Sequence, residues 1–317
     1  MTTHENNVSV ASNGMNLQRF QNYFFVLPAV LSVAAVLSVI VFGLRPGIDL
    51  AGGSLLQVTY PDGRPDVARV HETVDTLEYG EIRIQPSGTN DFILRQRVLT
   101  GDEKNTLDAE LAALGSVEEV QYTSVGPSIG GELITKAWWA VALVAISIII
   151  FIAWAFRHVS KPVASWKYGV VAIVTLLHDI LLPLGLFAFL GYFYGSEVGS
   201  LFIVALLTIL GISINDTIVV FDRIRENLAR NEKQNKTQSF TDVVWKSITQ
   251  TITRSINTSV TVIIMLLALV FLGPESTRDF ALTLTVGMVA GTYSSIFLAS
   301  PLLLLIAKYQ KTEKIVR

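Results

Sequence analysis

Six long apolar segments restrict this chain to a membrane. They lie at residues 24–42, 137–156, 168–190, 201–221, 255–272 and 280–307. A helix needs about 20 consecutive apolar residues to cross the hydrocarbon core of a bilayer, and most of these segments approach or exceed that length. The mean hydropathy of +0.50 and the low charged fraction of 16% agree with this interpretation. The sequence therefore predicts an α-helical protein with six transmembrane helices embedded in a lipid bilayer.

Basic residues in the short connections predict the orientation. They are concentrated in the connections 157–167 and 222–246 and in the C-terminal segment 308–317, whereas the connections 191–200 and 273–279 contain a single arginine between them. Lysine and arginine are retained on the cytoplasmic side of a membrane. We therefore expect both termini in the cytoplasm and the long segment between the first two spans outside. The net charge of −2 gives no indication of nucleic-acid binding.

The external segment is expected to form a small α+β domain. The alternation and turn residues predict four strands and two helices in the order strand 55–60, helix 66–77, strands 81–85 and 91–98, helix 102–114 and strand 117–125. This order is the ferredoxin-like pattern. The segment lacks a nucleophile–base set and a phosphate-binding loop, and the chain has no cysteine. We expect no cofactor or metal, and we expect binding or mechanical work from this domain rather than catalysis.

The chain divides accordingly into five regions. These are a cytoplasmic tail 1–22, transmembrane helix 23–43, a periplasmic or extracellular domain 44–136, transmembrane helices within 137–307, and a cytoplasmic tail 308–317.

Two charged residues stand out in the membrane region. Asp216 lies inside the fourth apolar segment, where a carboxylate costs about 2.5–3.5 kcal/mol on insertion scales, so that such residues are rare and usually functional. The apolar run 260–272 is too short to span a bilayer, and extending it backwards to the required length takes in Arg254. An acid and a guanidinium on consecutive spans indicate a protein that moves charge.

Other polar residues in these spans are candidate relay neighbours, namely Asn215, Thr217, Thr258 and Asp179. His178 precedes Asp179 directly, so the two side chains leave a helix about 100° apart and are not expected to face one partner. Structural alternatives exist for the charged pair. Asp216 could accept a hydrogen bond between helices, and Arg254 could extend to the cytoplasmic headgroups. Asp222 and the charged residues after it are expected to form a solvated helix face with i,i+3 and i,i+4 pairs.

Several motifs resemble the SecD/SecF family of protein-export subunits, and its SecF members most closely. The segment 47–54 (GIDLAGGS) is similar to the family's glycine-rich signature, and 125–130 (VGPSIG) to its second signature. The His178–Asp179 pair and the segment 214–227 (INDTIVVFDRIREN) are similar to the third and fourth spans of SecF. The segments 247–254 and 294–300 extend the resemblance, which covers everything except the N-terminal tail.

The resemblance implies a six-helix half of the RND-type fold that pairs with SecD in the bacterial inner membrane. It implies work at the SecYEG translocon, where the proton-motive force helps to move unfolded preproteins across. Proton passage is then attributed to Asp216 and Arg254. The signature residues at the junctions between the domain and the membrane are implied to act as turns and hinges, and they are Gly47, Asp49, Gly52, Gly53, Gly126 and Pro127.

Three other functions are alternatives to proton-coupled export. One is a passive scaffold that only docks SecD to the translocon, and another is an RND-type exporter of small molecules. The third is an intramembrane aspartyl protease built on Asp179 and Asp216, but the Gly-Xaa-Gly-Asp motif of those enzymes is missing because Ser213 and Asn215 precede Asp216. We therefore expect a transport subunit and not an enzyme.

Overall fold

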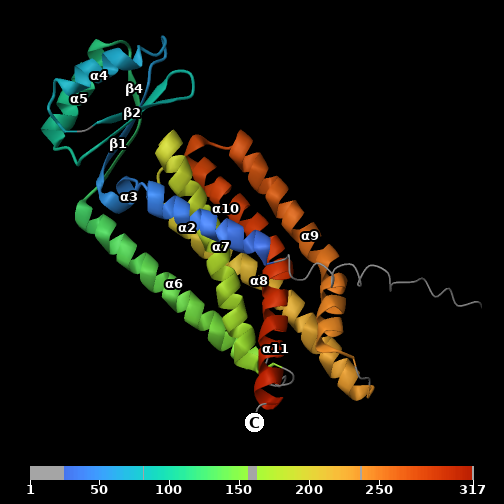
Figure 1. Ribbon diagram of the computed structural model, residues 1–317. Coiled ribbons are helices and arrows are strands. Elements are labelled where there is room, and N and C mark those ends of the chain that lie inside the picture. Colours follow the sequence, from blue (N-terminus) through green and yellow to red (C-terminus); the bar gives the residue numbers. More distant parts are fainter. Residues whose placement is uncertain (1–24, 81, 156–162, 236–237, 316–317) are drawn as a thin grey trace, which may run out of the picture. The chain divides into compact units, whose positions relative to one another are not determined.

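The computed structural model describes residues 25–80, 82–155, 163–235 and 238–315 (Figure 1). The chain separates into two compact units. The helical unit contains the described residues up to Leu44, residues 140–196 and those from 201 onward. The α/β unit contains residues 45–139 together with the short stretch 197–200. The predicted cytoplasmic tail 1–22 lies outside the described residues.

Long apolar helices make up the helical unit. They are α2 (Val26–Phe42), α6 (Pro127–Ala155), α7 (Ser165–Tyr194), α8 (Ser200–Lys233), α9 (Phe240–Leu272), α10 (Glu275–Ser294) and α11 (Ser300–Ile315). Within the described residues, five stretches are long and apolar enough to cross a membrane: α6, α7, α8, α9 and the combined stretch Ser276–Tyr309. The structure thus supports a helical membrane protein. The first predicted span corresponds to α2, which has 17 residues and is shorter than the other five.

Two helices begin in the α/β unit and continue into the helical unit. α6 starts at Pro127, ten residues before the apolar segment that predicted it, and proline is favoured at the first position of a helix. α8 starts at Ser200 and runs past its apolar segment to Lys233. The sequence predicted the apolar parts of these helices but not their polar ends.

The sixth apolar segment is one continuous path with an irregularity in its middle. α10 is followed at Ser295 by five residues of π-helix, Ser295–Ala299, and then by α11. The hydroxyl of Ser300 donates to the carbonyl of Ser295, five residues earlier, at 3.2 Å. Short π-helical turns often accompany functional sites.

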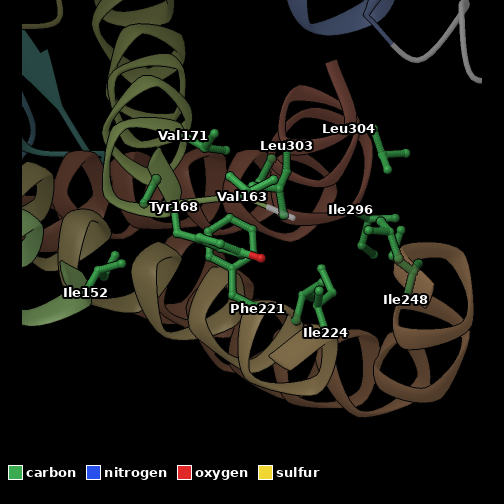
Figure 2. Close-up of a cluster of buried hydrophobic side chains, with 14 of the residues drawn as sticks. Ile152, Val163, Tyr168, Val171, Phe221, Ile224, Ile248, Ile296, Leu303 and Leu304 are labelled. Carbon is green, nitrogen blue, oxygen red and sulfur yellow. The ribbon is translucent and has the colours of Figure 1, made fainter. Parts of the chain in front are cut away.

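An apolar core joins the helices on one side of the helical unit (Figure 2). Tyr168 of α7 and Phe221 of α8 are both fully buried, and their rings meet edge to face with centroids 5.2 Å apart. Ile224 of α8, Ile248 of α9 and Leu303 of α11 belong to the same cluster. Because α7 and α8 both contribute several side chains to this cluster, their rotation about their own axes is fixed.

α2 packs closely against α7 through a glycine. A Cβ atom at Gly185 of α7 would lie only 2.4 Å from the Cα of Ala35, which is itself buried. The hydroxyl of Ser38 donates to the carbonyl oxygen of Gly185 at 2.7 Å. Small residues allow such close contact between helices in membranes.

The α/β unit contains a four-stranded sheet with two helices. Its elements follow the order β1 (Gly53–Thr59), α4 (Val67–Asp75), β2 (Arg83–Ser87), β3 (Asp91–Gln96), α5 (Gly101–Ala113) and β4 (Glu118–Val125), preceded by the short helix α3 (Ile48–Ala51). The strands lie in the order β2-β3-β1-β4, and neighbouring strands are antiparallel. This element order is the one that the sequence predicts.

Alternating side chains of the sheet form the core of the α/β unit with both helices. Leu56 and Val58 of β1 and Phe92 and Leu94 of β3 are buried on one face. Leu107 of α5 is fully buried, as are neighbouring residues of α4 and α5 at four-residue spacing. That spacing places them on one face of each helix, which explains why the two helices cover one face of the sheet.

Both helices of this unit have side-chain caps at their N-termini. Asp66, which the sequence predicts as a cap, accepts a hydrogen bond from the backbone N–H of Ala68 at 3.1 Å. At α5, Thr100 and Glu103 form a reciprocal capping box. A cap of this kind stabilises a helix by about 0.5–2 kcal/mol.

Candidate functional site

Asp216 is buried in the helical unit. It lies on α8 with 7% of its surface exposed, and the hydroxyl of Ser259 on α9 donates to its Oδ2 at 3.4 Å. Ser259 is itself 1% exposed. Burying a carboxylate with so few donors is costly, which favours a functional role over a purely structural one.

Arg254 lies near Asp216 but does not pair with it. The arginine is on α9 and exposed, and it is close enough to interact electrostatically with the carboxylate. Among the ion pairs of the described residues, with nitrogen–oxygen distances of 4.0 Å or less, none joins Arg254 to Asp216. The structure therefore brings the predicted partners to neighbouring helices without direct contact.

The other predicted neighbours of Asp216 occupy different faces of their helices. Asn215 is exposed, and Thr217 is buried but donates to the carbonyl of Ser213 on its own helix at 3.3 Å. Thr258 is exposed and donates to the carbonyl of Arg254 at 3.0 Å. None of the three has a hydrogen bond to Asp216 among those of the described residues.

The sequence analysis missed Ser259, the residue that does contact Asp216. A signal for it was present, because α9 carries a small hydroxyl residue at every fourth position, namely Thr251, Ser255 and Ser259. All three are buried. Residues at four-residue spacing share a helix face, so this row marks the side of α9 that packs inward.

Asp179 of α7 is the centre of a buried hydrogen-bond network. It has no exposed surface, and its Oδ2 accepts from the hydroxyl of Ser213 on α8 and from that of Ser294 on α10, the latter at 2.9 Å. Its Oδ1 lies 3.0 Å from Nδ1 of His178. The Nε2 of the same imidazole lies 2.7 Å from the hydroxyl of Tyr293 on α10. One carboxylate thus links three helices.

His178 and Asp179 bond to different partners on the neighbouring helices, in agreement with the expectation that they would not face one partner, but they also contact each other. Their Cβ atoms do leave α7 about 100° apart, but the side chains are long enough to turn toward each other. Both are buried, and the His178 ring bridges Asp179 and Tyr293 through its two nitrogens. The ring of Tyr293 also meets the imidazole edge to face at 5.4 Å. Pro183, four residues after Asp179, lacks the N–H that would bond the Asp179 carbonyl within the helix.

A small cavity connects Asp216 with Ser213. Its lining is otherwise mainly apolar and comprises Ile209, Ile212, Ser213, Asp216, Leu266, Leu284, Gly287, Met288 and Gly291. The cavity offers about 10 Å³ to the centres of water-sized spheres, which is room for about one water molecule.

Two glycines of α10 allow this helix to approach α8 at the cavity. A Cβ at Gly287 would lie 2.2 Å from the Cδ1 of Ile209, and one at Gly291 would lie 3.0 Å from the Cβ of Ser213. The close approach of these two helices positions Ser213 between them, next to Ser294 and Asp179.

The residues of the first glycine-rich signature contact the segment that leads into α8. Asp49 accepts hydrogen bonds from the backbone N–H of Ser200 at 3.0 Å and from its hydroxyl at 2.5 Å, so it caps the start of α8. The N–H of Gly47 donates to the carbonyl of Val198 at 2.9 Å. Nearby, Arg95 of β3 pairs with Glu197 at 3.1 Å. The signature thus holds the four residues that lead into α8.

The two signatures pack directly on each other. Gly52 and Gly53 have φ of +79° and +145°, as expected for turn glycines. A Cβ on Gly52 would lie 2.7 Å from the Cα of Pro127, and a Cβ on Gly130 would lie 2.4 Å from the carbonyl oxygen of Leu50. Gly126 directly precedes Pro127, where α6 begins. Glycine is required here for close packing as well as for backbone conformation.

The polar end of α8 has the solvated pairs predicted from its sequence. Arg223 bonds to Glu226 at 2.7 Å, Arg225 to Asp222 at 2.6 Å, and Arg230 to Glu226 at 3.1 Å. Asp222 is exposed. These charges are therefore distinct from the buried carboxylate of Asp216, which lies further back along the helix.

Comparison with known proteins identifies the family. A family model described as "Protein export membrane protein SecD/SecF, C-terminal" matches residues 106–309, and the "SecD/SecF GG Motif" matches residues 37–60. Protein translocase subunit SecF of Thermobaculum terrenum is 39% identical over 302 residues, which cover 91% of this chain and 93% of that protein. The same subunit of Anaerolinea thermophila is 36% identical, with 92% of this chain and 94% of that protein covered.

Solved structures agree with this result. The crystal structure of SecDF, a translocon-associated membrane protein from Thermus thermophilus, matches with a TM-score of 0.79 and 31% identity over 93% of this chain. A structure of SecDF in a "Super-membrane-facing form" matches with a TM-score of 0.66 and 31% identity over 94% of this chain. This chain spans only 38% and 39% of those two SecDF chains. The chain belongs to the SecF family of protein translocase subunits.

Proposed function

We propose that this protein uses the proton-motive force, together with SecD, to assist the export of unfolded preproteins through the SecYEG translocon. The names of its relatives, which are protein translocase subunits, support work in export. The likeness to SecDF chains that are more than twice as long supports pairing with SecD, which would supply the rest of the complex. The site of action is the inner membrane.

The buried carboxylate of Asp216 is the observation that carries the proposal. Asp216 lies in α8, a helix long and apolar enough to span a membrane, and within the described part of the chain its side chain has one weak hydrogen bond, from Ser259. A group with so little stabilisation of its charge is suited to taking up and releasing a proton. Arg254, close by but not bonded, can approach the carboxylate when it is ionised and move away when it is protonated.

The energy available limits what such a cycle can do. A proton that crosses 100 mV releases about 2.3 kcal/mol. That is enough to bias a two-state rotation of a domain but not enough to unfold a large structure. The proposed relay consists of Asp216 and Arg254, and it drives a conformational change.

The proposed topology has six transmembrane helices, with α2 as the first. Both termini are cytoplasmic, and residues 44–136 form a periplasmic domain of the ferredoxin-like type. The strand order β2-β3-β1-β4 supports that assignment. The absence of native cysteine allows a direct test, since single cysteines at Lys233 and Asp91 can be labelled with an impermeant thiol reagent in intact cells. Labelling at 91 and protection at 233 are expected, and the reverse pattern would overturn the orientation.

We further propose that the α/β unit moves relative to the membrane helices and contacts the preprotein. The hinge would lie at the packed signatures around Gly52, Gly53, Gly126 and Pro127. A disulfide between a cysteine pair introduced in the two units should block export stimulation while SecD still co-purifies. Undiminished export by the fully cross-linked protein would exclude an obligatory movement.

The relay is tested by two substitutions with a matched control. Asp216→Asn and Arg254→Met should each abolish proton-dependent export by the reconstituted complex without loss of membrane insertion or SecD binding. Asp222→Asn, on the solvated end of the same helix, should have little effect. A passive scaffold would retain full activity in all three variants, and that result would refute the relay. A small-molecule exporter or a protease would leave export unchanged and lose transport or cleavage instead.

A further inference from the structure

A second carboxylate is buried more deeply than Asp216 in the same helical unit. Asp179 has no exposed surface, compared with 7% for Asp216. It accepts hydrogen bonds from Ser213 and Ser294 on Oδ2, and its Oδ1 contacts His178. In the described residues no lysine or arginine forms an ion pair with it within 4.0 Å. Its partners are therefore groups that can pass or accept a proton.

Ser213 connects Asp179 with Asp216. It precedes Asp216 by three residues on α8, so both side chains share one face of the helix. Both line the cavity that has room for about one water molecule. A water there has two polar neighbours, the Asp216 carboxyl and the Ser213 hydroxyl, and the same hydroxyl donates to Asp179.

The network continues from Asp179 to the edge of the helical unit. His178 contacts Asp179 through Nδ1 and Tyr293 through Nε2, at 3.0 Å and 2.7 Å. Tyr293 is only partly buried. Hydrogen bonds thus form a continuous chain from Ser213 through Asp179 and His178 to Tyr293, a side chain that is partly exposed.

We propose that Asp179 is a second proton-holding residue of the relay, which exchanges a proton with Asp216 through one water molecule and Ser213. The proposal rests on the proposed function and extends it from one carboxyl group to two. In the transfer, the Asp216 carboxyl gives its proton to the water, the water gives one to the Ser213 hydroxyl, and Ser213 gives its own to Asp179. Only the two aspartates change charge.

The onward step uses the imidazole. Ser213 delivers the proton to Oδ2 of Asp179, whereas His178 contacts Oδ1, so the carboxyl group must first rotate to turn its protonated oxygen toward the ring. Asp179 then gives the proton to Nδ1 of His178, while Nε2 of the same ring releases one to the Tyr293 hydroxyl, which passes its own proton to the surface of the helical unit. The ring ends neutral, in the other tautomer, and returns by exchanging its protons. The groups that contact Asp179 are His178 from α7, Ser213 from α8 and Ser294 from α10, and Tyr293 of α10 contacts His178.

The two serines provide a matched pair for the test. Both donate to Oδ2 of Asp179, but only Ser213 also lines the cavity with Asp216. In proteoliposomes that contain the complex with SecD and the translocon, Ser213→Ala should lower proton-dependent export about a hundredfold, the low end for loss of a positioned proton-transfer group. Ser294→Ala should destabilise the protein to a similar degree, as measured by thermal unfolding, but should lower export much less than Ser213→Ala does.

Two outcomes separate this proposal from the proposed function. Equal export defects in Ser213→Ala and Ser294→Ala would overturn the route through Ser213, even when Asp216→Asn abolishes proton-dependent export. Normal export by Asp216→Asn would instead refute the proposed function and the route together.

Infrared spectroscopy tests the proton on Asp179 without reference to export. In pH-difference spectra of the purified complex carrying Asp216→Asn, one carboxyl band from a buried acid should remain. That band should disappear when Asp179→Asn is added, and SecD co-purification and the amide bands report whether this variant is folded. If the band is absent from the Asp216→Asn complex, or persists in the folded double variant, Asp179 does not take up a proton and the proposal fails.

Discussion

Replacement of Gly130 by alanine should loosen the packing between the two signatures of the α/β unit. The added Cβ would lie 2.4 Å from the carbonyl oxygen of Leu50 and 2.8 Å from its carbonyl carbon. Both are backbone atoms, so no side-chain rotation relieves the contact. Overpacking of this kind costs about 1–3 kcal/mol.

The net effect can be worked out from these contacts. Because the obstacle is backbone, we take the cost at about 3 kcal/mol, the upper end of the range for overpacking. Alanine is favoured over glycine within a helix by about 0.5–1 kcal/mol, which offsets part of the cost. The result is a loss of about 2 kcal/mol, or about a 30-fold rise in local opening.

Amide hydrogen exchange of the full chain in lipid nanodiscs measures this opening. The N–H of Gly52 bonds to the carbonyl of Ile48 at 2.9 Å, in the segment that Gly130 touches. Its exchange should accelerate about 30-fold in Gly130→Ala. Gly131→Ala is the matched control, because a Cβ there meets nothing within 4 Å, and exchange should be unchanged or slower. Equal exchange rates at Gly52 in the two variants would refute the argument that the signatures are held together by close packing.

Three further predictions concern other contacts. The hydrogen bond from Arg97, followed by that from the backbone of Thr100, lowers the pKa of Glu103 from 4.5 to about 2. The contribution of Glu103 to stability is therefore full above its pKa in the unfolded chain and is lost as the pH falls through about 2. Glu103→Gln should remove this part of the pH dependence of hydrogen exchange at the start of α5. Asp49→Ala should destabilise the start of α8 by about 0.5–2 kcal/mol, seen as faster exchange of its first amides, and unaltered exchange would argue against the cap. Gly185→Ala should lower the stability of the protein by about 1–3 kcal/mol because α2 must move away, and an unchanged unfolding temperature would contradict this.

The α/β unit was largely predictable from the sequence. Its elements carry local signals, since strands alternate, helices repeat buried residues at four-residue spacing, and Asp66 marks the start of α4. These signals depend on a polar and an apolar side of each element. The predicted boundaries therefore lie within a few residues of the observed ones.

The helical unit was predictable in its helices but not in its buried site. Apolar residues lie on every side of α7, so the sequence does not tell which side of this helix faces the protein interior. Ser294 reaches Asp179, and Tyr293 reaches His178, because of the way α10 is rotated against α7. Such rotations depend on contacts between distant segments.

One distinction at the site could have been predicted from helix geometry. Ser213, Asp216 and Thr217 are spaced by three and four residues and share a buried face of α8, whereas Asn215 falls on another side and is exposed. The same spacing on α9 could have predicted that Ser259, which donates to Asp216, lies on the inward face of that helix.

The central claim is that export and proton movement are coupled through Asp216. Its most direct test is proton uptake by proteoliposomes that contain the complex with SecD and the translocon, followed with a pH-sensitive dye while a preprotein is translocated under an imposed membrane potential. We expect proton uptake that depends on the preprotein in the wild type and none above background in Asp216→Asn, with Asp222→Asn close to wild type. Equal preprotein-dependent uptake by the wild type and Asp216→Asn would contradict the account.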